Sequence, residues 1–498
     1  MTDETVLISA LMEQSGVKFG TSGARGLAID MTDRVCYAYT KAFLNYLAAI
    51  DVIKLGDDVA IAGDYRPSSP RIMNAVAMAV ADGGYTPINC GFIPTPAVAH
   101  YAMARSQASV MVTGSHIPDD RNGIKFYKPS GEVLKQDESQ LYSSSVVLPD
   151  CFNAECQLDV EMAALPAESA LAEQEYIQRY LNFFPAGCLQ GRRVGVYQHS
   201  SVARDMMVTI FEGLGAEVTA LGRSLAFIPV DTEAIRPEDV QLAADWASSG
   251  DFDCLISTDG DGDRPLISDA KGHWLRGDVA GILTARYLEA THVVTPVSSN
   301  SAVEKCNWFE QVTRTRIGSP FVIAAMDQAV ARGAKNVVGY EANGGFLIAR
   351  DIVRGEKTLT ALPTRDAVIV PLTILLLAQQ GNSSVAELLE TLPERFTYSD
   401  RLKAFPTEIA HAKISSLNSG DESADKKAVE LLLGDIFGAV SSLNDTDGLR
   451  ITFANEEVVH LRPSGNAPEL RCYNEAASAQ RVAEMNRECM KILQEWRQ

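Results

Sequence analysis

The sequence predicts an α/β protein made of three related domains, followed by a C-terminal domain of α+β pattern. Three short apolar runs, at residues 108–113, 252–258 and 336–339, each lead into a polar loop and return as a second apolar run. A unit of strand, turn, helix and glycine recurs at 59–84 and 193–217. Internal repeats of this kind indicate copies of one structural unit, and the C-terminal part of the chain does not share them.

The first domain is expected over residues 1–155. Its predicted helices lie at 32–50 and 71–81, and its predicted strands lie at 59–62, 108–113 and 124–127, from the spacing of apolar side chains. After the strand at 108–113, Gly114 is expected to take an unusual backbone angle. Asn122-Gly123 is expected to turn the chain back into the second strand of this loop.

The second and third domains are expected over residues 156–272 and 273–385. A polar, alanine-rich connection precedes the second domain. Their predicted helices lie at 174–184, 204–211 and 360–380, and their predicted strands lie at 193–197, 252–258, 266–268, 293–297, 336–339 and 346–349. The apolar run 360–380 is interpreted as a single helix that begins at the turn Pro363-Thr364.

The fourth domain, expected over residues 386–498, has a different order of elements. A helix is predicted at 425–437, and Asp447-Gly448 leads into strands at 449–453 and 458–461. This order is typical of an α+β domain rather than of a fourth copy of the repeat.

Composition and charge exclude several classes of partner. The net charge of −20 opposes binding to nucleic acid or to an anionic membrane, because both are polyanions. Nine scattered cysteines without a C-x-x-C pair fit a reducing compartment. The start of the chain lacks a signal-peptide pattern, and the most apolar run, 367–378, is too short to span a bilayer. We therefore expect a cytoplasmic protein, with local arginine clusters if its substrate is an anion.

Three aspartates, Asp259, Asp261 and Asp263, alternate with glycines in the polar loop of the second domain. Carboxylates this close repel one another unless a cation lies between them, and Mg²⁺ is the usual choice where phosphate is handled. A calcium EF-hand is rejected because Arg264 and Ala270 stand where it needs Gly and Glu. A haloacid-dehalogenase pattern is disfavoured because the fifth residue is Asp263 rather than Thr or Val.

The polar loop of the first domain carries groups suited to a nucleophile. Ser115 follows a predicted strand, His116 is its neighbour, and Lys125 lies on the returning strand. A hydroxyl beside an imidazole and a cation suits nucleophilic chemistry. Taken alone, such a serine more often hydrogen-bonds its own turn, but the matching loops of the other two domains favour the functional interpretation.

Two further stretches offer groups that bind anions or sugars. The glycine-rich stretch 20–26 can direct backbone N–H groups and Arg25 at an anion, or can serve as a plain turn. In the loop of the third domain, Glu341 and Asn343 pair a hydrogen-bond acceptor with a group that both donates and accepts. That pair suits the vicinal hydroxyls of a sugar, although Asn-Gly-Gly is also a good turn.

A donor-rich loop lies between two strands of the fourth domain. It carries Arg462, Ser464 and Asn466 around Gly465, and its only acidic residue is Glu469. In a strongly acidic protein, arginines with few acidic neighbours predict a phosphate site rather than a solvated turn.

Four motifs together resemble the α-D-phosphohexomutase family, which includes phosphomannomutase, phosphoglucomutase and phosphoglucosamine mutase. They are Thr113-Gly-Ser-His, Asp259-Gly-Asp-Gly-Asp-Arg264, Tyr340-Glu-Ala-Asn-Gly-Gly345 and Arg462-Pro-Ser-Gly-Asn, in the family's order. The resemblance covers essentially the whole chain. It implies three similar α/β domains with mixed sheets and a C-terminal α+β domain like the TATA-box-binding protein, arranged around a central cleft.

The resemblance also implies an isomerase that interconverts hexose 1-phosphate and hexose 6-phosphate through a phosphoserine and a hexose 1,6-bisphosphate. The implied ligands of Mg²⁺ are Ser115, Asp259, Asp261 and Asp263. The implied catalytic residues are Ser115, His116, Lys125, Arg25 and Arg264. The implied substrate-binding residues are Glu341, Asn343, Arg316, Arg462, Ser464, Gly465, Asn466 and Arg471. A monomer or a homodimer is expected.

The sequence departs from the family's common pattern where the sugar is read. Ile117 stands in place of Asn, and Tyr340, Asn343 and Gly345 replace Gly, Ser and His. These changes bear on the choice of hexose, and the resemblance favours mannose over glucose or glucosamine. A metal-dependent sugar-phosphate phosphatase and an inactive sugar-phosphate sensor are the alternatives, and the intact Ser115 argues against the sensor.

Overall fold

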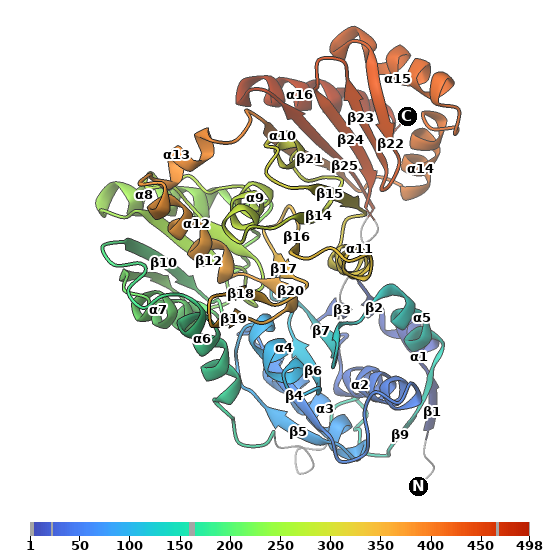
Figure 1. The fold of residues 1–498 in the computed structure, drawn as a ribbon. Coiled ribbons are helices and arrows are strands. Elements are labelled where there is room, and N and C mark those ends of the chain that lie inside the picture. Colours follow the sequence, from blue (N-terminus) through green and yellow to red (C-terminus); the bar gives the residue numbers. More distant parts are fainter. Residues whose placement is uncertain (1–3, 21–22, 159–164, 465–467, 498) are drawn as a thin grey trace.

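The structure, a computed structural model, describes residues 4–20, 23–158, 165–464 and 468–497 (Figure 1). Its larger sheets are mixed in the first part of the chain and antiparallel at the C-terminal end. Helices pack against each sheet, so the predicted fold class, α/β domains followed by an α+β domain, is confirmed. Within the described residues, none of the helices combines the length and apolar character that crossing a bilayer needs.

The first sheet holds the loop that contains Ser115. It runs in the order β2 (Lys18–Phe19), β3 (Gly23–Leu27), β7 (Arg121–Lys128), β6 (Ala108–Val112), β4 (Asp58–Gly63) and β5 (Thr86–Asn89), with β8 (Gly131–Glu132) beside β7. β4 lies parallel to β5 and β6, whereas β7 returns antiparallel to β6. Its helices are α1 (Ile8–Ser15), α2 (Asp33–Ala49), α3 (Ser69–Asp82), α4 (Thr95–Met103) and α5 (Lys135–Ser143), and β1 (Glu4–Leu7) pairs with β9 (Ser145–Leu148).

The second and third sheets repeat the arrangement of the first, in which two neighbouring strands are parallel and the next strand is antiparallel to them. The second sheet runs β11 (Glu217–Arg223), β10 (Arg193–His199), β12 (Cys254–Thr258) and β13 (Pro265–Ile267), with helices α6 (Leu171–Phe183), α7 (Arg204–Gly213) and α8 (Pro237–Ser249). The third runs β15 (Gln311–Thr315), β14 (His292–Pro296), β16 (Val337–Tyr340), β17 (Phe346–Ile348) and β20 (Leu362–Asp366). Its helices are α9 (Gly277–Tyr287), α10 (Ala302–Lys305), α11 (Ser319–Ala331), α12 (Ile369–Gln380) and α13 (Val385–Glu390), and β18 (Ile352–Arg354) pairs with β19 (Lys357–Leu359).

The C-terminal sheet is antiparallel throughout. It runs β21 (Phe396–Lys403), β25 (Glu469–Ala476), β24 (Val458–Pro463), β23 (Leu449–Phe453) and β22 (Val440–Asn444). Its helices are α14 (Thr407–Ser416), α15 (Glu422–Phe437) and α16 (Ala479–Glu495). The limits of the four domains along the chain stay a prediction.

One apolar core joins the first three sheets and leaves the C-terminal sheet separate. One core is continuous from β4 and α4 through α6 and α7 to α9 and α12, so the first three sheets share buried contacts. The C-terminal sheet and its helices have a core of their own. The first three sheets are therefore held together by shared apolar burial, and the C-terminal part is a separate packing unit.

The prediction of one helix over 360–380 was wrong. Residues Leu362–Asp366 form β20, an edge strand that pairs with β17, and the helix α12 begins only at Ile369. Three consecutive polar side chains of this strand, Thr364, Arg365 and Asp366, are buried and make tertiary hydrogen bonds. Pro363 fits the edge position, because an edge strand has one side where no N–H donor is needed.

Two local predictions in the first domain were also wrong. Asn122 and Gly123 lie inside β7, paired with β3, and do not form a turn. The residue in the left-handed backbone region is Ser115, with φ of 59°, and not Gly114. In the stretch 20–26, strand β3 begins at Gly23 and pairs with β2, and the Gly20 N–H donates to the Gly23 backbone oxygen at 2.7 Å. An anion-binding role for this stretch stays a prediction.

Candidate active site

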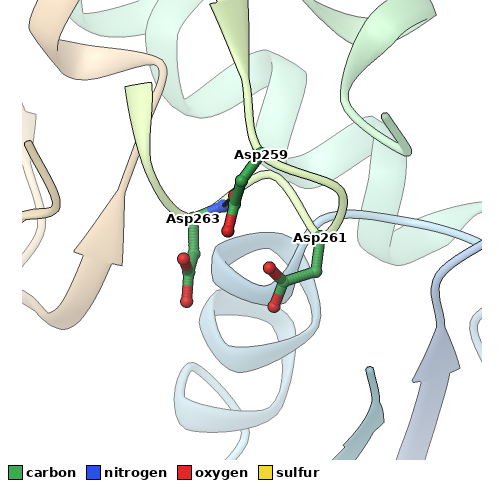
Figure 2. A group of neighbouring side chains, drawn as sticks. All are labelled: Asp259, Asp261 and Asp263. Atoms are coloured by element: carbon green, nitrogen blue, oxygen red, sulfur yellow. Dashed lines mark hydrogen bonds between the residues drawn. The ribbon is translucent and has the colours of Figure 1, made fainter. Parts of the chain in front are cut away.

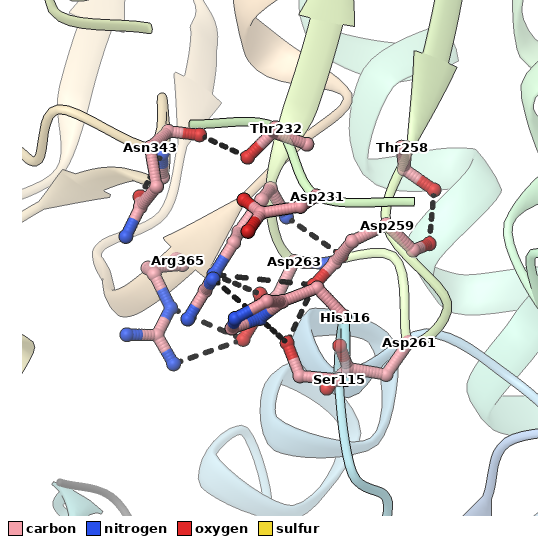
Figure 3. A network of polar contacts seen from close by, with 12 residues as sticks. Ser115, His116, Asp231, Thr232, Thr258, Asp259, Asp261, Asp263, Asn343 and Arg365 are labelled. Atoms are coloured by element: carbon pink, nitrogen blue, oxygen red, sulfur yellow. Dashed lines mark hydrogen bonds and ion pairs between the residues drawn. The ribbon is translucent and has the colours of Figure 1, made fainter. Parts of the chain in front are cut away.

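Three loops meet at the carboxyl ends of parallel strands. They follow β6, β12 and β16, the central strands of the first three sheets. Ligand sites of open α/β sheets lie at such ends. Figure 3 shows one residue from each loop, Ser115, Asp259 and Asn343, in one close view of the polar contacts at this place.

Ser115 is fully buried and points at the aspartate loop. Its Oγ donates a hydrogen bond of 2.6 Å to Asp259 Oδ2, across a sequence separation of 144 residues. Its backbone N–H donates to Thr113 Oγ1 at 2.7 Å, which helps to hold the left-handed conformation. That conformation is unfavourable for a residue other than glycine unless its surroundings fix it.

Arg66, which the sequence did not single out, supplies much of this support. Its guanidinium is fully buried and donates to the backbone oxygens of Ser115, at 3.0 Å, and Ile117. Asp64 accepts hydrogen bonds from Arg66 and, at 2.7 Å, from Thr113 Oγ1. A Cβ atom at Gly114 would lie 2.8 Å from the Arg66 guanidinium, so the glycine is needed for close approach rather than for its backbone angle.

The three aspartates of the second loop form a compact carboxylate cluster. Figure 2 shows Asp259, Asp261 and Asp263 pointing into the same space, and one oxygen from each lies within 4.8 Å of the others. All three are fully buried. The loop can turn this tightly because Gly262 has φ of 69° and packs against Pro94, where a Cβ atom would come within 2.9 Å.

The residues fit a divalent cation. Burial raises the pKa of Asp259 well above its usual value, and the charges of Asp261 and Asp263 raise it further. Among the described atoms, Oδ1 of Asp261 and Oδ1 of Asp263 are buried without a hydrogen-bond partner. Buried carboxylate oxygens without partners are costly, and a metal ion would satisfy them. The cluster can therefore hold a metal ion.

Two cations from other sheets already offset part of this negative charge. Lys125 Nζ donates to Asp261 Oδ2 and Asp263 Oδ2, at 2.6 Å each. The guanidinium of Arg365 on β20 lies 3.0 Å from Asp263 Oδ2. Burial pushes the pKa of Asp261 upward, but Lys125 and a hydrogen bond from Thr95 outweigh it, so the pKa ends below its usual value.

His116 and Arg264 form a pair beside Ser115. Arg264 Nη1 donates to His116 Nδ1 at 2.7 Å, and the same ring nitrogen lies 3.4 Å from Ser115 Oγ. Burial, followed by the charge of Arg264, lowers the pKa of His116 well below its usual value, so the ring is neutral at neutral pH. Arg264 also lies within 3.9 Å of Asp259 and 3.7 Å of Asp263.

Arg25 stands close to this group on β3. Burial and then the charge of Arg264 lower the pKa of Arg25 to about 10, whereas Asp261 opposes the change. Its strand pairs with β7, the strand that carries Lys125. The structure thus brings together Ser115, the three aspartates and all four predicted basic catalytic residues, which are Arg25, His116, Lys125 and Arg264.

The third loop joins this network through Arg365. Arg365 Nη1 donates to Glu341 Oε2 at 3.1 Å, while its other nitrogens reach Asp263. Asn343 is held by its own loop, since its Oδ1 accepts from the Gly345 N–H at 2.9 Å. Its backbone oxygen accepts from Thr232 Oγ1 at 2.7 Å, so a segment of the second domain also borders the site.

The predicted phosphate loop is less tightly held. Arg462 Nε lies 2.9 Å from Asp447, and Arg471 lies 3.4 Å from Glu469. The prediction that Glu469 is the only acidic neighbour was wrong, because a turn distant in sequence brings in Asp447. Arg316 is exposed and donates to the Thr446 backbone oxygen at 3.1 Å.

Not every predicted phosphate-loop residue can be placed. Ser464 is buried, and its N–H donates to the Glu469 backbone oxygen at 2.8 Å. Gly465 and Asn466 lie outside the described residues. The roles of all these residues stay a prediction.

Comparison with protein families points to one family. The matching descriptions are "Phosphoglucomutase/phosphomannomutase" alpha/beta/alpha domain I over residues 16–145, domain III over 276–396 and the C-terminal domain over 417–492. A phosphomannomutase of Salmonella muenchen is 43% identical to this chain over 468 residues, covering 94% of each protein.

Solved structures share the fold. A phosphoglucomutase/phosphomannomutase family protein of Burkholderia thailandensis has a TM-score of 0.70 at 19% identity and covers 96% of both chains. N-acetylphosphoglucosamine mutase of Aspergillus fumigatus, in complex with GlcNAc-6P and magnesium, has a TM-score of 0.59 at 13% identity. The match covers 99% of this chain and 100% of that one.

Proposed function

The chain belongs to the phosphoglucomutase/phosphomannomutase family, and we propose that it interconverts mannose 1-phosphate and mannose 6-phosphate through a phosphorylated Ser115. It is an isomerase of the phosphohexomutase kind. The choice of mannose rests on the 43% identity to a phosphomannomutase. The observation that carries the assignment of the nucleophile is the buried contact of 2.6 Å between Ser115 Oγ and Asp259.

In the proposed cycle, Ser115 carries a phosphoryl group when the substrate binds. The free hydroxyl of the hexose phosphate attacks this phosphorus, so one sugar–phosphate bond forms and the bond to Ser115 Oγ breaks. The hydroxyl proton passes to a base of the protein. The resulting hexose 1,6-bisphosphate turns end for end, Ser115 Oγ attacks its other phosphorus, and the product leaves with the newly formed phosphate ester.

Asp259, Asp261, Asp263 and the oxygen of Ser115 would hold the metal ion, and we propose Mg²⁺. A bound Mg²⁺ would supply positive charge to the phosphoryl group during transfer. The unpartnered Oδ1 atoms of Asp261 and Asp263 support this assignment. So does the relative from Aspergillus fumigatus, which is in complex with magnesium.

The basic residues would neutralise the remaining charge of the transferring group. Lys125 is fixed between two carboxylates, and Arg264 is fixed against His116, so both can act without reorganisation. Lys125 and His116 are the two candidates for the proton transfer. The full burial of Ser115 supports a mutase over a phosphatase, because water must be kept away from a phosphoserine.

Two further groups of predicted residues would bind the parts of the substrate that lie away from Ser115, namely the sugar hydroxyls and the second phosphate. Glu341 and Asn343 would accept and donate hydrogen bonds to the sugar hydroxyls. Arg462, Arg471 and Arg316, with the loop around Ser464, would bind the phosphate that does not react. Because the substrate must be accepted in two orientations, this end needs positive charge more than a fixed geometry.

Turnover of mannose 1-phosphate tests the proposal against its alternatives. We expect conversion to mannose 6-phosphate, faster with a trace of mannose 1,6-bisphosphate, and little release of inorganic phosphate. Steady release of phosphate would establish a phosphatase instead. Absence of both activities would indicate a sugar-phosphate sensor. Glucose, glucosamine and N-acetylglucosamine 1-phosphates, tested beside mannose, decide the sugar.

Two further properties belong to the proposal. All nine cysteines are free, which fits a reducing compartment, and we propose the cytoplasm. We propose a monomer or a homodimer, which sedimentation of the purified protein decides.

A further inference from the structure

A groove of about 590 Å³ lies between the third and the C-terminal sheets, away from the carboxylate cluster. Its walls come from the segment that follows β14, from α10 and β15, and from β22 to β24. On β23, Leu449, Ile451 and Phe453 face the core of the C-terminal part, so Arg450 and Thr452 face the opposite way, into the groove. The volume is that of sites that bind small molecules.

The groove carries more positive than negative charge, in a chain whose net charge is −20. Its described lining contains three cations, Lys305, Arg314 and Arg450, and two carboxylates, Glu304 and Glu456. Lys305 pairs with Glu456 at 2.8 Å, and Arg314 binds Glu304 through two nitrogens at 2.7 and 2.8 Å. Both carboxylates are therefore already used.

Arg450 is the cation left over. Among the described residues it has no carboxylate within 4.0 Å, and its Nη1 donates to Thr452 Oγ1 at 3.2 Å. Two carboxylates, Glu475 and Glu304, are near enough to interact electrostatically with Arg450. Glu475 is paired with Arg395, and Glu304 is paired with Arg314. Burial and then the charge of Arg314 lower the pKa of Arg450. A half-buried guanidinium in this position is stabilised by an anion.

We propose that this groove is a second anion site, which binds a small hydroxyl-bearing molecule with a phosphate or carboxylate group. Arg450 holds the anionic group of this molecule. The neutral polar side chains of Ser441, Asn444 and Thr452 bind the hydroxyls of the molecule. Phosphate and carboxylate share one feature, which is a pair of oxygens that accept hydrogen bonds from one planar guanidinium.

The groove is joined to the phosphate end of the active site by a short chain of contacts. From Arg314 the chain continues into Arg316, which donates to the Thr446 backbone oxygen, and Ile317, whose N–H donates to Asp447 Oδ2 at 2.9 Å. Asp447 in turn pairs with Arg462 at 2.9 Å. These contacts place the groove and Arg462 on one connected set of residues, so the two anion sites must be distinguished by separate variants.

Calorimetric titration with inorganic phosphate tests the binding itself. In the intact protein we expect two binding events, one abolished by Arg450→Met and the other by Arg462→Met. Arg487→Met, which removes an exposed arginine of α16, is the matched control and is expected to keep both events. An Arg450→Met protein that keeps both events would overturn the proposal, and so would a single event that only Arg462→Met removes.

A second variant covers the case in which Arg450→Met does not fold. Ser441→Glu places a carboxylate in the groove from an exposed position and is expected to abolish the same event. Citrate in place of phosphate distinguishes a carboxylate-bearing from a phosphate-bearing ligand. These titrations do not require turnover, so absence of mutase activity would refute the proposed function and leave this result standing.

Discussion

The two ends of the candidate site are built differently. At the reacting end, Ser115, Lys125 and the three aspartates are buried and fixed by contacts of 2.6 Å that join two sheets. At the phosphate end, Arg316 is exposed and Arg462 is half-buried. The described contacts of these arginines are longer, from 2.9 Å upward.

The apolar cores explain the difference. One core connects the first three sheets, whereas the C-terminal sheet has a core that is not part of it. Phosphoryl transfer depends on positioning, so the groups that react belong to the part that packs as one body. Binding a phosphate in two orientations needs charge and some freedom, and that task falls to the separately packed part.

The largest effect is expected from changing the carboxylate cluster. Asp261→Asn removes one negative charge and a partner of Lys125, and we expect kcat to fall about a thousandfold. Added Mg²⁺ should restore part of the rate if the loss is one of metal affinity. A full rate at low Mg²⁺ would show that the cluster binds no catalytic ion.

Arg66→Met should give the next largest effect, although Arg66 is not expected to touch the substrate. Without its hydrogen bonds to Ser115 and Ile117, the nucleophile loop loses its support, and we expect kcat to fall about a hundredfold with KM little changed. Mg²⁺ affinity, measured by calorimetry, should be kept. Equal losses in kcat, KM and metal affinity would indicate a general defect in folding instead.

Arg462→Met should change KM rather than kcat. Loss of one charged hydrogen bond to phosphate costs about 1.5–3 kcal/mol, so KM for mannose 1-phosphate should rise about 10- to 100-fold. We expect kcat to change much less than it does in Asp261→Asn. If kcat falls and KM does not change, the phosphate end takes part in the chemistry and the contrast between the two ends is lost.

The smallest effects concern two buried histidines, one under each end. His199 Nε2 lies 2.8 Å from the Thr258 backbone oxygen, just before Asp259, and His460 Nε2 lies 2.6 Å from the Asp447 backbone oxygen. Each should donate there as a neutral ring. His199→Gln should lower kcat a few-fold, whereas His460→Gln should raise KM a few-fold, because each carbonyl orients a different end.

The same histidines predict how stability depends on pH. Burial lowers the pKa of both to about 4, against a usual value of 6.5, so the unfolded state binds more protons between these values. The free energy of unfolding should therefore fall as the pH drops from 6.5 toward 4, by up to about 3 kcal/mol for each histidine. Urea unfolding at several pH values measures this slope, which either Gln variant should reduce.

The sequence predicted the order of elements and the loop residues well, because apolar spacing and clustered carboxylates are local signals. It could not predict Arg66 or Arg365, because the contacts that bring them to the site, Arg66 with Ser115 and Arg365 with Asp263, join residues far apart along the chain. Arg365 lies in a run that was interpreted as helix. A strand forms there because its neighbours make buried tertiary hydrogen bonds, Thr364 with Glu132 and Asp366 with Tyr176 and Tyr180. Pro363, interpreted as the start of that helix, is equally compatible with an edge strand.

Phosphorylation of Ser115 is the central claim, and mass spectrometry of peptides tests it most directly. After the protein is mixed with mannose 1,6-bisphosphate, we expect phosphate on Ser115 in the intact protein and none in Ser115→Ala, which should also lack turnover. Phosphate found only on another residue, or a Ser115→Ala protein that still interconverts the two mannose phosphates, would contradict the account.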